Sequence, residues 1–230
     1  PTAACNSPAD FITAAGHTPA PINTPHAASL KPLDAVVLLR CSNISYSGDP
    51  DVDQAVANGM ALLLDSDQYN GTHPYLPGNP GVSTSFACPP SIDLAANAPI
   101  ANGPGGTLTD ASLDNYAGGL CILVGSVQAS QLPAGAIPFL LSGSSQYVGA
   151  FGYAHGGGRV AFSMSQFTQG VQGFHPWWPA SRTYLANALD WAISNSVRPD
   201  ISCASEGYAG TQLTWCQNIC EKGYTGATLN

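Results

Sequence analysis

The feature that most constrains this chain is a strand, a helix and a second strand in immediate succession. Residues 34–40, DAVVLLR, are a continuous apolar run with β-branched side chains, typical of a central strand buried on both faces. In residues 48–59, GDPDVDQAVANG, Asp49 can cap a helix, the next proline suits its first position, and Gly59 can end it. Residues 60–66, MALLLDS, are a second buried run. This order predicts a parallel, right-handed βαβ unit.

The remaining patterns predict further elements of an α/β domain. Four later apolar runs indicate additional strands: 120–127, 137–143, 147–154 and 159–164. The last two are joined by HGGG at 155–158, which favours a hairpin turn. Residues 180–195 show the pattern of an amphipathic helix, and shorter helices are expected at 8–16 and 109–116. The remainder of residues 68–119 is rich in Gly, Pro, Asn and Ser and predicts long loops.

The chain is predicted to divide into two parts. We expect an α/β domain at 1–198 and a separate small module at 199–230, with Arg198 and Pro199 at the boundary. The module contains three of the cysteines and a short internal repeat, GYAGTQL and GYTGATL. It is similar to the short cysteine-containing C-terminal extensions of assorted exported bacterial proteins, and we expect it to carry disulfides.

Charge excludes several classes of partner. Only 9% of residues are charged, against about 25% in an average protein, and the formal net charge is -8. Six Lys and Arg in 230 residues cannot form the basic patch that nucleic acid or an anionic membrane requires. No apolar run reaches the ~18 residues needed to span a bilayer, so membrane insertion is not expected. A surface with so few charges repels its neighbours weakly, which favours packing against copies of the same chain.

The cysteines predict the compartment. None of the seven shows the C-x-x-C spacing of a zinc site, and they are Cys5, Cys41, Cys88, Cys121, Cys203, Cys216 and Cys220. The first interpretation is disulfide bonding in an oxidising compartment, which predicts an extracellular or cell-surface protein. The alternative is buried free thiols in a cytosolic protein. An odd count leaves at least one thiol free, bonded to another chain, or paired with a cysteine beyond these residues.

The order of these elements resembles the class I glutamine amidotransferase-like superfamily, which includes trehalose-utilisation-type domains. The resemblance covers about residues 5–197 and is carried by AAGHT at 14–18, DAVVLL at 34–39, MALLLDS at 60–66, LPAGA at 132–136, YAHGGGRVAF at 153–162 and YLANALDWA at 184–192. It implies a flavodoxin-like fold with a mostly parallel central sheet and a C-terminal hairpin. The opening strand of the family has no match before residue 8.

The resemblance also implies where a catalytic residue would stand. Members with amidotransferase activity place a nucleophilic cysteine at the sharp turn after a central strand. Here that turn is Leu64-Asp65-Ser66-Asp67, which contains no cysteine. Ser66 could act as a nucleophile only with a histidine in hydrogen-bond reach, and His73 and His155 are the candidates. The alternative is an inert turn at the end of a strand.

Two other motifs have a functional and a structural interpretation. HGGG at 155–158 matches the oxyanion-hole string of some lipases, but the G-x-S-x-G motif that must accompany it is absent. Asp49, Asp51 and Asp53 alternate like the start of a calcium loop, without its glycine and distal glutamate. Helix capping is the alternative for the three aspartates. The five histidines show no ligand-like spacing, so no metal and no cofactor are predicted.

Two surface features remain. His175, Trp177 and Trp178 lie in an aromatic loop that could stack on a sugar or a partner, or could pack over the core as a lid. Asn43 and Asn70 each begin an N-x-[ST] sequon for glycosylation.

Three hypotheses for function follow. The first is a non-enzymatic extracellular structural protein that assembles with copies of itself into a surface layer or fibre. The second is a surface module that binds carbohydrate through Trp177 and Trp178. The third is a diverged serine hydrolase with its site at the turn around Ser66.

Overall fold

The computed structural model describes residues 9–22, 25–39, 48–66, 71–87, 89–114, 124–164, 180–197 and 210–216. The chain divides into two compact units, Pro1–Val197 and Arg198–Asn230. In the second unit the described element is the helix α7 (Gly210–Cys216). The first unit is an α/β domain, and it contains every site discussed below.

One half of the sheet is parallel and forms around the βαβ unit. It consists of three strands in the order β1 (Ala35–Leu39), β2 (Ala61–Asp65) and β11 (Gly158–Ser163). The crossover helix α3 (Pro50–Ala57) connects β1 to β2, and the Asp49 side chain accepts from the backbone N–H groups of Asp51 and Val52. The βαβ prediction is therefore confirmed. One detail is corrected, because β1 is the last strand on its side of the described sheet rather than a central strand.

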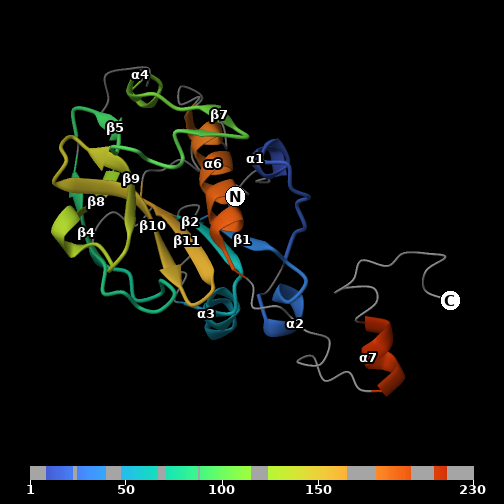
Figure 1. Ribbon diagram of the computed structural model, residues 1–230. Helices are drawn as coiled ribbons and strands as arrows, with labels where there is room; N and C mark the ends of the chain where they lie inside the picture. Colours follow the sequence, from blue (N-terminus) through green and yellow to red (C-terminus); the bar gives the residue numbers. More distant parts are fainter. Residues whose placement is uncertain are drawn as a thin grey trace, which may run out of the picture. The chain divides into compact units, whose positions relative to one another are not determined.

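The other half of the sheet is antiparallel (Figure 1). The long strand β10 (Tyr147–His155) pairs with β11 and also with β8 (Val124–Gln128) and β9 (Ile137–Ser142). Shorter strands extend these pairs: β3 (Gly71–Thr72), β4 (Ser83–Ala87) and β5 (Ile92–Leu94). The hairpin prediction is confirmed, but the expectation of a mostly parallel sheet is wrong. In the described main sheet two pairings are parallel and six are antiparallel.

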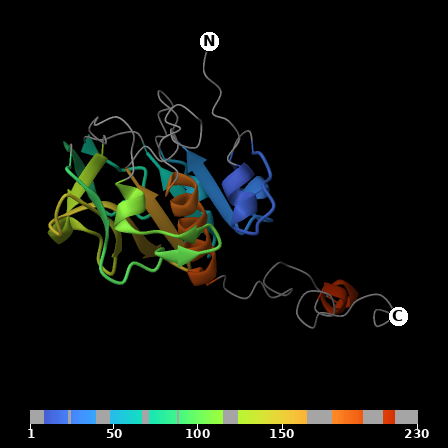
Figure 2. The ribbon, with the colours of Figure 1, turned by 90° about the horizontal axis from the view of Figure 1, so that it is seen from above.

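Helices cover both faces of the parallel half. The helix α6 (Ala180–Asn195) lies against one face, where it packs with the short helix α1 (Ala9–Ala14) on Ala61 and Leu63 (Figure 2). On the opposite face α3 and α2 (Ala27–Leu30) pack with Leu62 and Leu64. Successive residues of a strand point to opposite faces, so β2 supplies both cores in turn. Burial of a strand on both faces explains its unbroken apolar sequence.

The region between β4 and β8 contains more structure than its composition predicted. It holds β5, the helix α4 (Asp110–Leu113) and a small hairpin of β6 (Asn102–Gly103) and β7 (Gly106–Thr107). The Asn187 side chain of α6 accepts from the Gly105 N–H at 2.9 Å and donates to the carbonyls of Ile100 at 2.9 Å and Gly106 at 3.0 Å. One buried amide therefore fixes the hairpin on the helix.

The outer edge of β5 is closed by carboxylates. The N–H groups of Ile92 and Leu94 donate to Asp114 Oδ1 at 2.8 Å and Asp110 Oδ1 at 2.7 Å. Ile92 and Leu94 are two residues apart on a strand, and Asp110 and Asp114 are four residues apart on a helix. Both spacings correspond to about 6–7 Å, so each carboxylate can face one N–H group. Asp110 and Asp114 thus replace the carbonyls of a neighbouring strand and protect this edge from further pairing.

Candidate functional site

Polar residues collect at the carboxyl end of β2, the end of a parallel sheet where α/β proteins usually bind ligands. Asp65, Ser66 and Ser163 are all fully buried. Ser163 lies opposite Asp65 in the β2–β11 register, and the Ser66 N–H donates to the Ser163 carbonyl at 2.9 Å. Because side chains alternate along β2, Asp65 points toward the α6 face and Ser66 toward the α3 face. One strand end therefore supplies two separate polar clusters.

The cluster on the α6 face holds a buried carboxylate. The Ser163 hydroxyl donates a hydrogen bond to Asp65 Oδ1. Tyr184 of α6 is buried beside them, and this burial raises the pKa of its phenol; the Asp65 carboxylate adds to the rise and a hydrogen bond with Ser163 opposes it. A carboxylate in such a place must be hydrogen-bonded to be tolerated. These three side chains therefore tie α6 to the ends of β2 and β11.

The cluster on the α3 face is a chain of hydrogen bonds. Ser66 Oγ lies 3.2 Å from Tyr75 Oη, which lies 2.5 Å from His73 Nδ1. His73 Nε2 lies 2.8 Å from Thr84 Oγ1, and the Thr84 hydroxyl donates to the Gly71 carbonyl at 3.5 Å. Since the Thr84 hydrogen points to Gly71, we infer that its oxygen accepts from His73 Nε2–H. The other ring nitrogen then accepts from Tyr75, which in turn accepts from Ser66.

This arrangement bears on the serine hydrolase hypothesis. Ser66 and His73 come together in one cluster, as the sequence predicted, but the Tyr75 hydroxyl stands between them. A serine nucleophile needs a base within hydrogen-bond reach of its own hydroxyl. Here His73 is bonded to Tyr75 and Thr84, and both Ser66 and His73 are buried, with His73 1% exposed. The geometry described here is that of a buried structural network, and the hydrolase hypothesis stays a prediction.

Sequence reasoning missed two members of this network, Thr84 and Tyr75. Tyr75 lies at the start of a long Gly- and Pro-rich region, in the string His73-Pro74-Tyr75. No periodicity marks it, because the residue sits in a turn between β3 and β4. A buried tyrosine usually bonds through its hydroxyl, so the closeness of His73 in the sequence was the one available signal.

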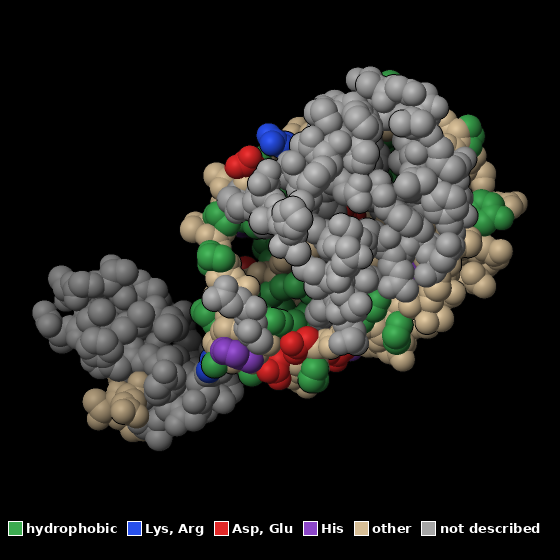
Figure 3. Space-filling view, turned by 180° about the vertical axis from the view of Figure 1, so that it is seen from behind, with side chains coloured by type: hydrophobic (Ala, Val, Ile, Leu, Met, Phe, Trp, Pro, Cys, Tyr) green, Lys and Arg blue, Asp and Glu red, His purple; other side chains and the backbone are tan. Residues whose placement is uncertain are grey.

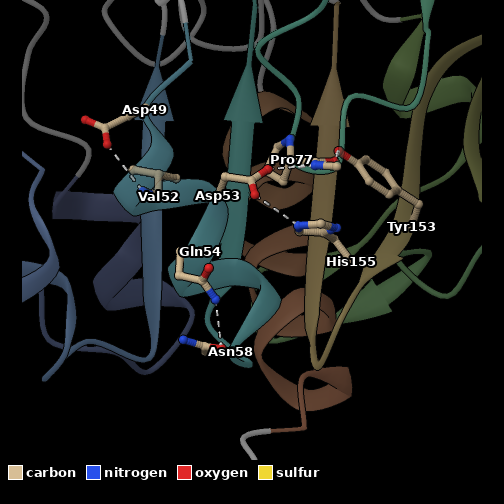
Figure 4. A network of polar contacts seen from close by, with 9 residues as sticks. Asp49, Val52, Asp53, Gln54, Asn58, Pro77, Tyr153 and His155 are labelled. Atoms are coloured by element: carbon tan, nitrogen blue, oxygen red, sulfur yellow. Dashed lines mark hydrogen bonds and ion pairs between the residues drawn. The ribbon is translucent and has the colours of Figure 1, made fainter.

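His155, the second candidate base, lies in a different part of the fold (Figure 4). Its Nε2 is 3.4 Å from Asp53 Oδ2 of α3, and Asp53 Oδ1 accepts from the Gly78 N–H at 2.7 Å. Close by, the Tyr153 hydroxyl donates to the Pro77 carbonyl at 3.0 Å. Burial raises the pKa of Tyr153, and the Asp53 carboxylate adds to the rise. These contacts join α3, the turn after Tyr75 and the end of β10.

The three glycines after His155 serve this hairpin and not an oxyanion hole. The Gly157 N–H donates to the Ala57 carbonyl at 2.9 Å, and the Gly157 carbonyl accepts from the Val197 N–H at 2.7 Å. A Cβ on Gly156 would lie 2.2 Å from the Ala57 carbonyl oxygen, and one on Gly158 would lie 2.2 Å from that of Val56. The turn therefore contacts the end of α3 so closely that a side chain has no room.

The three aspartates near α3 bind different backbone groups. Asp49 caps the helix, Asp51 accepts from the Ala27 N–H at 2.9 Å, and Asp53 accepts from Gly78. In the described part of the chain no three His, Cys, Asp or Glu side chains are grouped so as to hold a metal ion. The capping interpretation therefore accounts for Asp49, and connections to α2 and to the turn at Gly78 account for the other two.

Several predicted features lie outside the described residues. They are the aromatic residues His175, Trp177 and Trp178, the sequon residues Asn43 and Asn70, Asp67, and six of the cysteines. For Cys216 the backbone alone is described, at the end of α7. The predicted disulfides, the sugar-binding loop and the glycosylation sites therefore stay predictions.

Comparison with known proteins gives a weak structural likeness. No family model and no curated protein matches the sequence. Among solved structures, a match is found to a protein described as cytoplasmic protein STM3548 from Salmonella typhimurium, with a TM-score of 0.44 and 15% identity. The match covers 79% of this chain and 78% of the other.

One expectation about location is corrected here. The sequence predicted an extracellular or cell-surface protein, whereas the matched protein is described as cytoplasmic. The extracellular assignment is therefore withdrawn, and a likeness at this TM-score does not assign another compartment to this chain. Among the described helices, none combines the length and the apolar character required to cross a membrane.

Proposed function

We propose that this chain is a non-enzymatic structural protein that assembles with copies of itself. The observation that carries the proposal is the buried hydrogen-bond network at the carboxyl end of β2. Ser66, Tyr75, His73 and Thr84 bond to one another below the surface. Groups held in this way stabilise the junction of β2 with the turn before β4. The described molecule would then interact with other copies through its outer surface.

The composition of that surface supports assembly. Charged residues make up 9% of the chain, and Figure 3 shows few charged side chains on the described part of one face. Copies of a weakly charged protein approach one another at little electrostatic cost, although the net charge of -8 still opposes close contact in general. Uncharged Ser, Thr, Asn and Gln can supply hydrogen bonds between copies without that penalty.

We further propose that the domain is a variant of the flavodoxin-like arrangement found in the class I glutamine amidotransferase-like superfamily. The parallel strands β1, β2 and β11, with α6 on one face and α3 on the other, support this proposal. The position of the family nucleophile is occupied here by Ser66, which is buried. A scaffold of this kind without an accessible nucleophile is consistent with a structural role.

Size-exclusion chromatography with light scattering tests the proposed assembly. The chain has a mass of 23.6 kDa, and the proposal predicts an average mass that rises above this value with protein concentration. Because few charges take part, raising the salt from ~0.05 to ~0.5 M, about a threefold decrease in Debye length, should leave the association nearly unchanged or strengthen it slightly. A mass that stays at that of one chain at the highest soluble concentration would contradict the proposal.

A further inference from the structure

The antiparallel half of the sheet contains a long stretch of chain without charge. Between Asp114 and Arg159 the sequence has no Asp, Glu, Lys or Arg. The described residues of this stretch form β8, the 3₁₀ turn η1 (Ala129–Gln131), β9 and β10. In a chain with a net charge of -8, the surface of these elements differs from the rest by carrying no fixed charge of its own.

Two exposed segments of this stretch meet in space. Gln128 pairs with Tyr147 across β8 and β10, and the Ala129 N–H donates to the Gln146 carbonyl at 2.8 Å. Residues 128–131 and 144–147 are exposed throughout. They form one continuous surface of Gln, Ser, Ala and Tyr, which is here named the uncharged strip.

The strip also carries an exposed aromatic ring. Tyr147 is 39% exposed, whereas Ile137, which is 42% exposed, belongs to the same charge-free stretch but pairs with Gly152, further along β10. Among the described residues three large hydrophobic side chains are classed as exposed, and two of them belong to this charge-free stretch. An aromatic ring among small polar groups is a combination that binding surfaces use often, because the ring gives contact area at low entropic cost.

We propose that the uncharged strip is the surface on which a second copy of this chain docks, an inference that rests on the proposed self-assembly. In a two-fold contact the same surface faces its own copy, so that residue i contacts residue j and residue j contacts residue i, and the strip meets only groups that the strip itself contains. A glutamine amide and a serine hydroxyl can pair with such groups, since each both donates and accepts, whereas two carboxylates repel. Two copies can therefore meet through the strip without like charges opposed.

The alternative of joining sheets edge to edge is less suitable at β5. Its outward N–H groups are already bonded to Asp110 and Asp114. A second copy at that edge would have to displace both carboxylates and would bring its own pair beside them. Contact through side chains of the strip requires no such rearrangement.

Sedimentation velocity of two matched triple variants of the full chain tests the strip. The first changes Gln128→Glu, Gln131→Glu and Gln146→Glu, so that like charges oppose one another across the contact. The second changes Thr13→Glu, Thr18→Glu and Gln54→Glu, which are exposed residues outside the strip, so both variants have the same net charge. Circular dichroism confirms that each variant is folded before its association is measured.

The strip variant should associate at least about tenfold more weakly than the wild type, because charges facing one another across an interface are unfavourable. The control variant should remain within about twofold of the wild type, as distant charges are screened by salt. If the wild type associates and both variants weaken equally, or neither weakens, the strip is not the contact and the proposed function survives. If the wild type is monomeric at every concentration, both the strip and the proposed function are overturned.

Discussion

Some polar groups at the strand ends of the two halves of the main sheet lie in different settings. In the parallel half, the strand ends carry Asp65, Ser66 and Ser163, which are buried and bonded to neighbouring elements. In the antiparallel half, the ends of β8 and β10 carry Gln128 and Gln146, which are exposed. A strand covered on both faces must satisfy its polar groups internally, whereas a turn at the rim leaves them to solvent or to a partner. If the proposed docking holds, association belongs to the antiparallel half, whereas these buried groups of the parallel half stabilise the fold.

The largest expected effect comes from breaking the junction of the two halves. Gly158→Ala would place a Cβ 2.2 Å from the Val56 carbonyl oxygen and 2.4 Å from that of Met60, both of them backbone atoms that cannot move aside. We expect a loss of about 3 kcal/mol in the free energy of unfolding, the upper end for overpacking. Urea denaturation measures it.

The control for this change is Gly81→Ala. Gly81 adopts a positive φ of 72°, but a Cβ there meets nothing within 4 Å. Its expected cost is therefore about 1 kcal/mol, from backbone strain alone. Equal losses in the two variants would show that the contact between the hairpin and α3 is less tight than described.

A smaller effect is expected at the edge of the antiparallel half. The double change Asp110→Ala and Asp114→Ala removes both acceptors of the outward β5 N–H groups. We expect a loss of about 2 kcal/mol in stability, since hydrogen bonds to charged groups are worth about 1.5–3 kcal/mol each and these are partly exposed. Hydrogen exchange at the amides of Ile92 and Leu94 should accelerate.

The double change Asp110→Asn and Asp114→Asn is the matched control, because an amide oxygen can still accept both bonds. It should keep the exchange of the two amides near the wild-type rate. If the alanine and asparagine variants behave alike, the carboxyl groups do not protect the edge of β5.

The smallest effect concerns alkaline pH and compares one tyrosine from each half. Burial raises the pKa of both Tyr153 and Tyr184, while an unfolded tyrosine titrates near pH ~10. As the pH rises above ~10 the unfolded state releases these protons first, so the stability held below that pH is lost above it. Above pH ~10, each buried tyrosine should make the free energy of unfolding fall by about 1.4 kcal/mol per pH unit.

Tyr153→Phe and Tyr184→Phe should each remove one such contribution, so that the free energy of unfolding falls less steeply at alkaline pH. Urea denaturation between pH ~9 and ~11, around the pKa of ~10 of an unfolded tyrosine, measures this fall. Seven other tyrosines, two lysines and seven cysteines can also titrate in or near this range, so each variant is compared with the wild type and not with a calculated slope. A fall of unchanged steepness in both variants would mean that these phenols are not protected from ionisation.

The parallel half could be predicted from the sequence because its signals are local. Two unbroken apolar runs, the cap at Asp49 and the stop at Gly59 define β1, α3 and β2 almost to the residue. In the antiparallel half the long strands β9 and β10 and the hairpin were also predicted, but their pairing was not. Short strands such as β5 have no periodicity and are selected by contacts such as those with β9, so the expectation of a mostly parallel sheet failed.

The candidate site was predicted in part for similar reasons. Ser66 and His73 were named because a residue type at a strand end carries chemical meaning on its own. Tyr75 and Thr84 were not, since their roles depend on a turn that brings residues from β3 and β4 against the end of β2. His155 was assigned to the wrong neighbours, because the length of β10 carries it to α3 rather than to Ser66.

The proposed function depends on the proposal that the polar groups at the carboxyl end of β2 serve the fold rather than catalysis. The most direct test is labelling of the folded protein with a fluorophosphonate, which reacts with activated serines. We predict no labelling of the wild type above that of Ser66→Ala, with the exposed-serine variant Ser144→Ala as control. Labelling that is lost in Ser66→Ala and kept in Ser144→Ala would contradict this proposal.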